Sequence, residues 1–246
     1  MRYAKDFFDL QLLFARRVAE LRGIPLERAV LDYTNIYIRL AIGRGFCADH
    51  PLWRAYVGGL NAAPDAGEWT HRFHLGRPPS EPPNVVATFG CFSYAVQQGG
   101  RIRLHFANRE SGSLSPLAVS RSDARRHELR HLLAHVERTQ PAARTVAGVS
   151  WLYNLPQYRR LFPQTYLASA RVVGDRFRNM PLWGQFLDRH GALKPAAAKT
   201  FRERLSRLSS PDALLDCFPL QPLAVEAPVG DFYRALRLPD AAPASQ

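Results

Sequence analysis

Lysine is nearly absent from this chain, which has 3 lysines against 30 arginines and a formal net charge of +12. A strongly basic chain invites a nucleic-acid interpretation. The arginines are scattered, however, and no run of five basic residues occurs. We therefore expect a generally basic surface or an anionic small-molecule ligand, with nucleic acid or a protein as the alternative partner.

Cysteine and long hydrophobic runs are also scarce. Cys47, Cys91 and Cys217 are widely spaced and odd in number, which argues against a disulfide framework or a cysteine-based metal pair. No apolar run approaches the roughly 18 residues that a membrane span needs. The first residues, MRYAKDFFDLQ, carry acidic side chains where a signal peptide has an apolar stretch. These absences predict a cytoplasmic protein without membrane contact.

Several functional signatures are missing as well. The sequence contains no Walker loop, no dinucleotide-binding glycine pattern, no G-x-S-x-G and no internal repeat. What remains is a globular composition, with 46% hydrophobic and 22% charged residues among 246. Such a chain can form one large domain or two small ones with an ample core.

The stretch from Val85 to Asn154 has the strongest structural pattern. Residues 85–97 are apolar at nearly every position, which favours a central strand covered on both faces. Residues 101–108 alternate, with Ile102, Leu104 and Phe106 on one face, and Gly99-Gly100 before them suits a hairpin turn. After a polar helix, residues 145–154 give a third apolar run. The pattern predicts an α/β (α+β) fold with a central mixed sheet and covering helices.

The flanking segments complete this prediction. Helical spacing of apolar residues predicts helices over 3–22, 25–45 and 51–60, so that a helical layer precedes the sheet. Short strands are expected at WTHRFHLG, TYLASARVV and CFPLQPLAV, and helices over 180–190 and 196–208. We place a helical region at 1–75, an α/β region at 84–237 and a disordered tail at 238–246.

The motif HELRH, from His127 to His131, has the spacing of a zinc-binding H-E-x-x-H helix. The histidines project away from the stripe formed by Leu129, Leu132 and Val136, and arginines surround them. We expect a solvated helix face and no metal. A zinc hydrolase using His127, Glu128 and His131 is the least favoured function.

Strand ends supply the other candidate site residues. His105, on the polar face of its strand, is a candidate catalytic base, with a surface histidine as the alternative. Trp151 can wall a pocket or pack in the core. We predict a cleft at these strand ends, whose residues are His105 and Tyr153 as catalytic groups and Ser150, Trp151, Asn154, Asn108, Arg109 and Tyr94 as substrate-binding groups.

Five segments carry a distant family resemblance between Arg22 and Arg171 and at one later site. They are RGIPLERAVLDYTNIYIRLAIGRGF, RIRLHFAN, LSPLAVSRSDAR, VAGVSWLYNLPQYRRLFP and CFPLQ. Together they resemble bacterial proteins that join an N-acyltransferase N-terminal domain to a GNAT-like C-terminal domain. Gly148-Val149 stands where that family has Cys-His, and Asn154 stands where it has Asp.

The resemblance implies a GNAT-like fold and transfer of an acyl group from acyl-CoA to an amine, or a degenerate relative of such an enzyme. A base would deprotonate the amine, which attacks the thioester while strand-end amides stabilise the oxyanion. The alternative is a basic binding protein without enzymatic activity.

Overall fold

The computed structural model describes residues 3–78, 85–112, 114–174 and 177–236, and by their contacts these residues form two compact units. The helical unit combines the described residues up to 78 with those from 173 to 222. The sheet unit combines those from 85 to 172 with those from 223 to 236. The tail predicted at 238–246 lies outside the described residues.

The helical unit is built from amphipathic helices around an aromatic core. In α1 the apolar residues Phe7, Phe14 and Val18 recur at helical spacing and are fully buried. Gly23 ends this helix in the left-handed conformation, with φ of 62°. The elements of the unit are α1 (Lys5–Arg22), α2 (Leu26–Tyr33), α3 (Ile36–Arg39), α4 (Pro51–Ala62), α5 (Ala66–Leu75), α9 (Met180–Trp183), α10 (Pro195–Ser206) and the 3₁₀ turns η4 (Gly184–Phe186) and η5 (Pro211–Cys217).

Aromatic rings that are distant in sequence meet in this core. The ring centroid of Phe14 lies 5.6 Å from that of Trp183 and 5.3 Å from that of Phe218, both edge-on. Such pairs stabilise a core beyond the burial of their surface. Residues 173–222 therefore group with the N-terminal helices, whereas the sequence-based boundaries placed them inside a continuous region 84–237.

The segment WTHRFHLG, predicted as an edge strand, is instead part of α5. The prediction missed the helix cap. The Asp65 carboxylate accepts hydrogen bonds from the N–H groups of Gly67 and Glu68 at 2.9 and 3.0 Å, which satisfies donors that a helix start leaves open.

The helix predicted over 25–45 is also shorter than expected, because it breaks between α2 and α3. The hydroxyl of Thr34 donates to the Val30 carbonyl oxygen at 2.6 Å. The N–H of Asn35 donates to the side-chain oxygen of Gln11 at 2.9 Å. These bonds replace helical ones and turn the chain.

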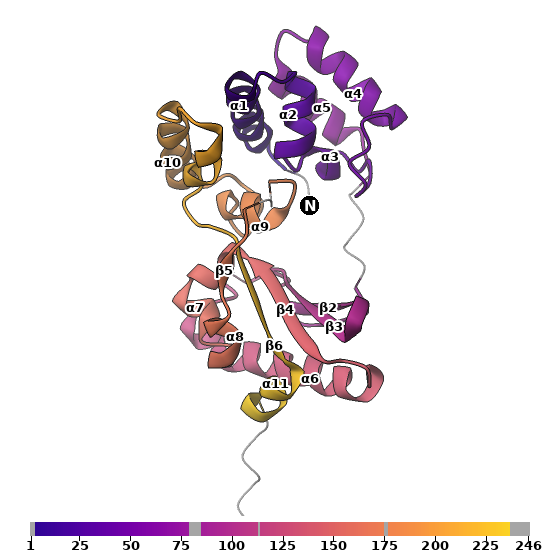
Figure 1. Cartoon of the computed structure of the whole chain (residues 1–246), viewed down its shortest axis with the longest axis vertical. Coiled ribbons are helices and arrows are strands. Elements are labelled where there is room, and N and C mark those ends of the chain that lie inside the picture. Colours follow the sequence, from indigo (N-terminus) through magenta and orange to yellow (C-terminus); the bar gives the residue numbers. More distant parts are fainter. Residues whose placement is uncertain (1–2, 79–84, 113, 175–176, 237–246) are drawn as a thin grey trace, which may run out of the picture. The chain divides into compact units, whose positions relative to one another are not determined.

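The sheet unit contains a six-stranded mixed sheet in the order β1-β2-β3-β4-β6-β5, which confirms the predicted mixed sheet with covering helices (Figure 1). Only β3 and β4 pair in parallel within it, and α6 connects them. The elements are β1 (Ala87–Phe89), β2 (Phe92–Gln97), η1 (Gln98–Gly100), β3 (Arg101–Phe106), η2 (Val119–Arg121), α6 (Ser122–Thr139), β4 (Thr145–Ser150), η3 (Trp151–Asn154), α7 (Pro156–Arg159), α8 (Gln164–Ala168), β5 (Arg171–Val172), β6 (Leu223–Pro228) and α11 (Val229–Leu236).

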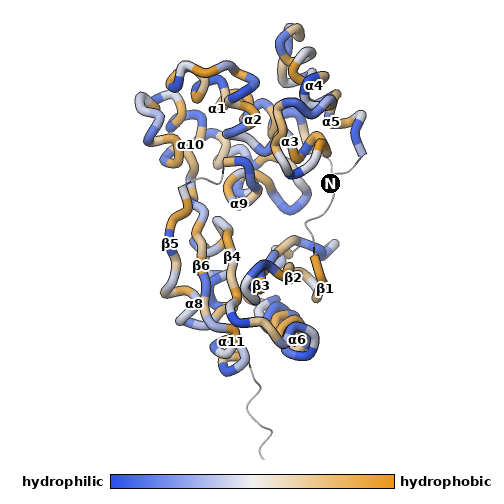
Figure 2. The backbone as a smooth tube through the Cα atoms, turned by 45° about the vertical axis from the view of Figure 1, so that its right-hand side comes forward, coloured by the Kyte–Doolittle hydropathy of each residue, from blue (hydrophilic) through white to orange (hydrophobic). Residues whose placement is uncertain are grey.

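Strand alternation sorts the side chains of the sheet onto two faces. Ile102, Leu104 and Val146 lie on the face that packs against α6, and they join a core to which α7, α8 and α11 also contribute. Figure 2 shows hydrophobic and hydrophilic residues alternating along α6, as expected of a helix with one face on a sheet. The opposite face of β3 carries Arg101, Arg103 and His105.

The hairpin is as predicted, since Gly99 and Gly100 have φ of 72° and 69° and join β2 to β3. The run 85–97 is not one central strand, however. Gly90, with φ of 55°, and Cys91 separate β1 from β2, and both strands lie toward one edge of the sheet. Val86 and Val96 are 50% and 44% exposed, so an apolar run here does not mean two covered faces.

Three later strand predictions also need correction. TYLASARVV is largely helical, since α8 occupies Gln164–Ala168 and only Arg171–Val172 forms β5. The strand predicted in CFPLQPLAV as an edge is β6, which pairs with β4 on one side and β5 on the other. The strand predicted over residues 145–154 ends at Ser150, and the next four residues form η3.

None of the helices in the described ranges is long and apolar enough to cross a membrane.

Candidate functional site

The two parallel strands of the sheet stop pairing before they end. β3 and β4 pair at Arg101 with Thr145, Ile102 with Val146 and Arg103 with Ala147. Both strands continue, to Phe106 and to Ser150, but among the described residues they pair no further with each other. We call residues 104–106 and 148–150 the splayed end. The carboxyl ends of parallel strands are where ligands bind in such sheets, which makes the splayed end the candidate site.

A group of buried tyrosines lies against the splayed end. The hydroxyls of Tyr153, in η3, and Tyr166, in α8, are 2.8 Å apart and hydrogen-bonded. The Tyr158 ring lies 5.1 Å from that of Tyr153. A Cβ on Gly148 would lie 2.1 Å from the Tyr153 hydroxyl oxygen and 2.6 Å from that of Tyr166. Glycine at the splayed end therefore allows both hydroxyls to reach the backbone of β4.

The environment of these tyrosines keeps them protonated. Burial, and then the neighbouring Tyr166 hydroxyl, raises the pKa of Tyr153 well above its usual value. Burial likewise raises the pKa of Tyr158 and of Tyr166. At neutral pH the hydroxyl of Tyr153 is therefore protonated and can donate a hydrogen bond.

His105 lies two residues beyond the last parallel pair, within the splayed end. It is half-buried and stands opposite Ser93 of β2. By strand alternation its side chain is on the other face of the sheet from the tyrosine core. The structure therefore places the two predicted catalytic residues at the same strand end but on opposite faces.

Three of the predicted binding residues help to form the turn after β4. The Ser150 hydroxyl oxygen accepts a hydrogen bond from the Leu152 N–H at 3.1 Å. The Asn154 side-chain amide donates to the Trp151 carbonyl oxygen at 2.9 Å. These bonds fix the turn that carries Tyr153, so Ser150 and Asn154 have a structural task at this site.

The remaining predicted residues lie in β2 and in the loop after β3. The Tyr94 hydroxyl is 3.5 Å from the hydroxyl oxygen of Thr139, which places Tyr94 beneath the last turn of the helix. The Asn108 side-chain oxygen accepts from the Glu110 N–H at 3.1 Å. Arg109 is exposed.

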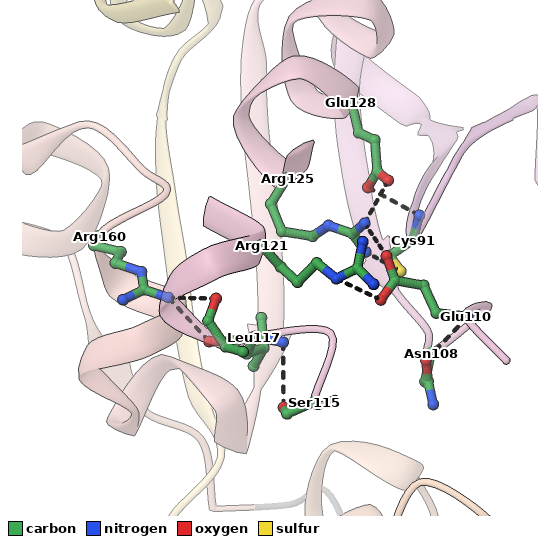
Figure 3. A network of polar contacts seen from close by, with 10 residues as sticks. Cys91, Asn108, Glu110, Ser115, Leu117, Arg121, Arg125, Glu128 and Arg160 are labelled. Atoms are coloured by element: carbon green, nitrogen blue, oxygen red, sulfur yellow. Dashed lines mark hydrogen bonds and ion pairs between the residues drawn. The ribbon is translucent and has the colours of Figure 1, made fainter. Parts of the chain in front are cut away.

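A buried ionic cluster next to the splayed end was not predicted (Figure 3). Arg125 of α6 is 2% exposed, and its guanidinium lies 2.5 Å from Glu110 and 2.9 Å from Glu128. It also donates to the sulfur of Cys91, whose N–H donates to Glu128 at 3.0 Å. Arg121 lies 3.8 Å from Glu110 and brings a second cation to that carboxylate. Burial raises the pKa of the Cys91 thiol.

This cluster had a signal in the sequence. Arg125 stands four residues before Leu129 and continues the apolar stripe of α6 toward its start, so it occupies a core position. A charged residue at a core position is almost always paired. Glu128, at the i+3 position, is one of the partners.

Both ends of the segment between β3 and α6 are held in place. Arg125 binds Glu110 near its start. Near its end, the Arg160 guanidinium donates to the carbonyl oxygens of Leu117 and Ala118 at 2.9 and 3.1 Å (Figure 3). Arg121 and the exposed Arg109 give this segment positive charge beside the splayed end.

Glu128 of the H-E-x-x-H motif binds the Arg125 guanidinium and the Cys91 N–H, so the carboxylate that a zinc hydrolase would use as its base is engaged in the ionic cluster. Within the described residues, no group of three or more His, Cys, Asp or Glu side chains is arranged to hold a metal ion.

Comparisons with protein-family models, with curated proteins and with solved structures find nothing that matches the chain.

Proposed function

We propose that the chain is a GNAT-like acyltransferase that moves an acyl group from acyl-CoA to an amine, with the splayed end of β3 and β4 as its binding site. The observation that carries the proposal is the loss of pairing between these parallel strands before their carboxyl ends. The amide groups of the CoA arm have the chemistry to pair with exposed strand edges, as an added strand does.

Positive charge beside the splayed end supports an anionic donor. Arg109, Arg121 and Arg159 lie on the segment before α6 and on α7, and each is at least partly exposed. Guanidinium groups bind phosphate with paired, directed hydrogen bonds. The phosphates of CoA would lie on this side of the site.

His105 and Tyr153, on opposite faces of the sheet, have different roles in the proposed reaction. His105 takes a proton from the acceptor amine, whose nitrogen then attacks the thioester carbon. Strand-end amides stabilise the oxyanion, and its collapse breaks the carbon–sulfur bond. The leaving thiolate takes up the proton that His105 removed from the amine, and the Tyr153 hydroxyl, which burial keeps protonated, serves as a hydrogen-bond donor.

Calorimetric titration with acetyl-CoA and with longer acyl-CoAs tests this proposal. We expect binding by at least one of them, with free CoA competing for the same site. Tyr153→Phe and His105→Ala should retain binding and lose turnover. No binding by any acyl-CoA rejects the proposal.

The basic charge also supports a second candidate, a binding protein for nucleic acid. Several arginines have internal roles, however, since Arg17 and Arg204 donate to backbone carbonyl oxygens and Arg125 is buried. Titration with duplex and single-stranded DNA decides between the two. Affinity that falls linearly on a log–log plot with salt, in the absence of acyl-CoA binding, favours the second candidate.

A further inference from the structure

Two histidines lie side by side on the outer face of α6. His127 and His131 are one helical turn apart and both are exposed. The centroids of their imidazole rings are 4.1 Å apart, with 49° between the ring planes. Side chains at i and i+4 share a helix face, which brings their donor atoms within reach of one ion.

The neighbouring charged groups have partners of their own. The Arg130 guanidinium donates to the Leu236 carbonyl oxygen at 2.9 Å. The Arg126 guanidinium lies 3.6 Å from Asp123 and donates to the Arg160 carbonyl oxygen at 3.4 Å. The Asp123 carboxylate offsets part of the Arg126 charge, and both guanidiniums are directed toward acceptors of their own.

His135, one further turn along, differs from these two. Its ring lies 5.4 Å from that of Phe89 and 6.0 Å from that of Tyr94, and it is half-buried between the helix and the sheet. The chain therefore offers two imidazoles at this place, consistent with the lack of any larger group of ligands among the described residues.

We propose that His127 and His131 form a surface site for one divalent transition-metal ion. Zinc binds imidazole nitrogen at about 2.0–2.1 Å. Rotation of two exposed rings brings one nitrogen of each to that distance from a shared ion. Nickel and copper also suit imidazole, whereas magnesium prefers oxygen ligands. The other coordination positions are open to water or to a ligand from a partner molecule. This site is independent of the proposed acyl transfer.

Titration of the tag-free chain with zinc chloride and nickel chloride, in a buffer without chelators, tests the site. We expect one ion per chain and a melting temperature that rises with metal concentration, because the ion binds the folded helix. His127→Ala and His131→Ala should each weaken binding by about tenfold or more. Magnesium chloride should give neither effect.

His135→Ala is the matched control on the same helix and should keep the zinc and nickel affinity. A double variant, His127→Ala with His131→Ala, that binds one ion as tightly as the original chain would overturn the assignment. So would the absence of binding in the original chain while its circular dichroism shows intact helices.

Discussion

A Cβ added to Gly148 would lie 2.1 Å from the hydroxyl oxygen of Tyr153, closer than any non-bonded contact allows. The Tyr153 hydroxyl therefore occupies the space that a side chain at Gly148 would need. We expect Gly148→Ala to destabilise the sheet unit by about 1–3 kcal/mol, the usual cost of overpacking. Chemical denaturation measures this cost.

The matched control is Gly230→Ala in α11, where a Cβ would meet only ordinary contacts. Its stability should be unchanged or slightly higher, since alanine favours helix. In a Tyr153→Phe background, Gly148→Ala should cost less. An equal cost in both backgrounds would contradict the contact.

Arg125 carries a second prediction. Replacing it with Met leaves Glu110 and Glu128 without their buried cation, and this should cost about 3–5 kcal/mol. Adding Glu110→Gln should recover part of the loss. Arg234→Met is the control, because Arg234 pairs with Asp231 at an exposed position and should cost less than about 1 kcal/mol. Similar costs for the two arginines would argue against a structural role for the cluster.

The buried tyrosines predict a loss of stability in alkali. Burial raises the pKa of Tyr166 in the folded chain above its unfolded value of 10.0. Its contribution is complete below that unfolded value and is lost as pH rises toward the folded one, because the unfolded chain releases the proton first. Each such group contributes up to about 1.4 kcal/mol per pH unit.

Denaturation midpoints between neutral pH and strongly alkaline pH check this expectation. Tyr166→Phe should have a shallower decline than the original chain. Identical slopes would mean that Tyr166 does not titrate differently in the folded and unfolded chains.

Phe14 and Phe218 test the composition of the helical unit. Their rings meet edge-on at 5.3 Å, although the residues are far apart in sequence. Each alanine variant should cost about 3–5 kcal/mol. A double-mutant cycle should give a coupling of about 0.5–1.5 kcal/mol. Additive costs would indicate that residues 173–222 do not share this core.

His105 tests the proposed chemistry. His105→Ala should lower acyl transfer by about a hundredfold or more, as expected for loss of a general base. The same substitution should lower the free energy of unfolding only slightly, near the lower end of the range for point variants, because His105 lies on the polar face of β3. The exposed His190, in the helical unit, is the control, and His190→Ala should retain activity. Full activity of His105→Ala would remove this residue from the mechanism.

Local patterns predicted some elements well. The alternation in β3, the paired glycines of the hairpin and the apolar stripe of α6 are all properties of neighbouring residues, which the sequence displays directly. His127 and His131 of α6 are exposed, as expected, but His135, which the helical spacing also placed on the outer face, is half-buried against Phe89 and Tyr94. The cap at Asp65 was also visible in the sequence, and attention to it would have identified α5.

The candidate site was predicted only in part. Its position at the ends of two strands was expected from the sequence, but His105 and Tyr153 were expected in one cleft and lie on opposite faces of the sheet. Tyr158 and Tyr166 were missed because the order of the strands brings α7 and α8 against β4. The partners of Arg125 were missed for the same reason, since Cys91 and Glu110 lie on separate loops.

The sequence by itself determined long amphipathic helices such as α1, α6 and α10, the hairpin and the mixed α/β character, because these depend on periodicity and on the backbone freedom of glycine. Only the tertiary structure decided which strands are central, where β3 and β4 part, and that residues 173–222 share a core with α1. The physical reason is that pairing register and core packing join residues far apart in the chain, and no local pattern specifies such partners.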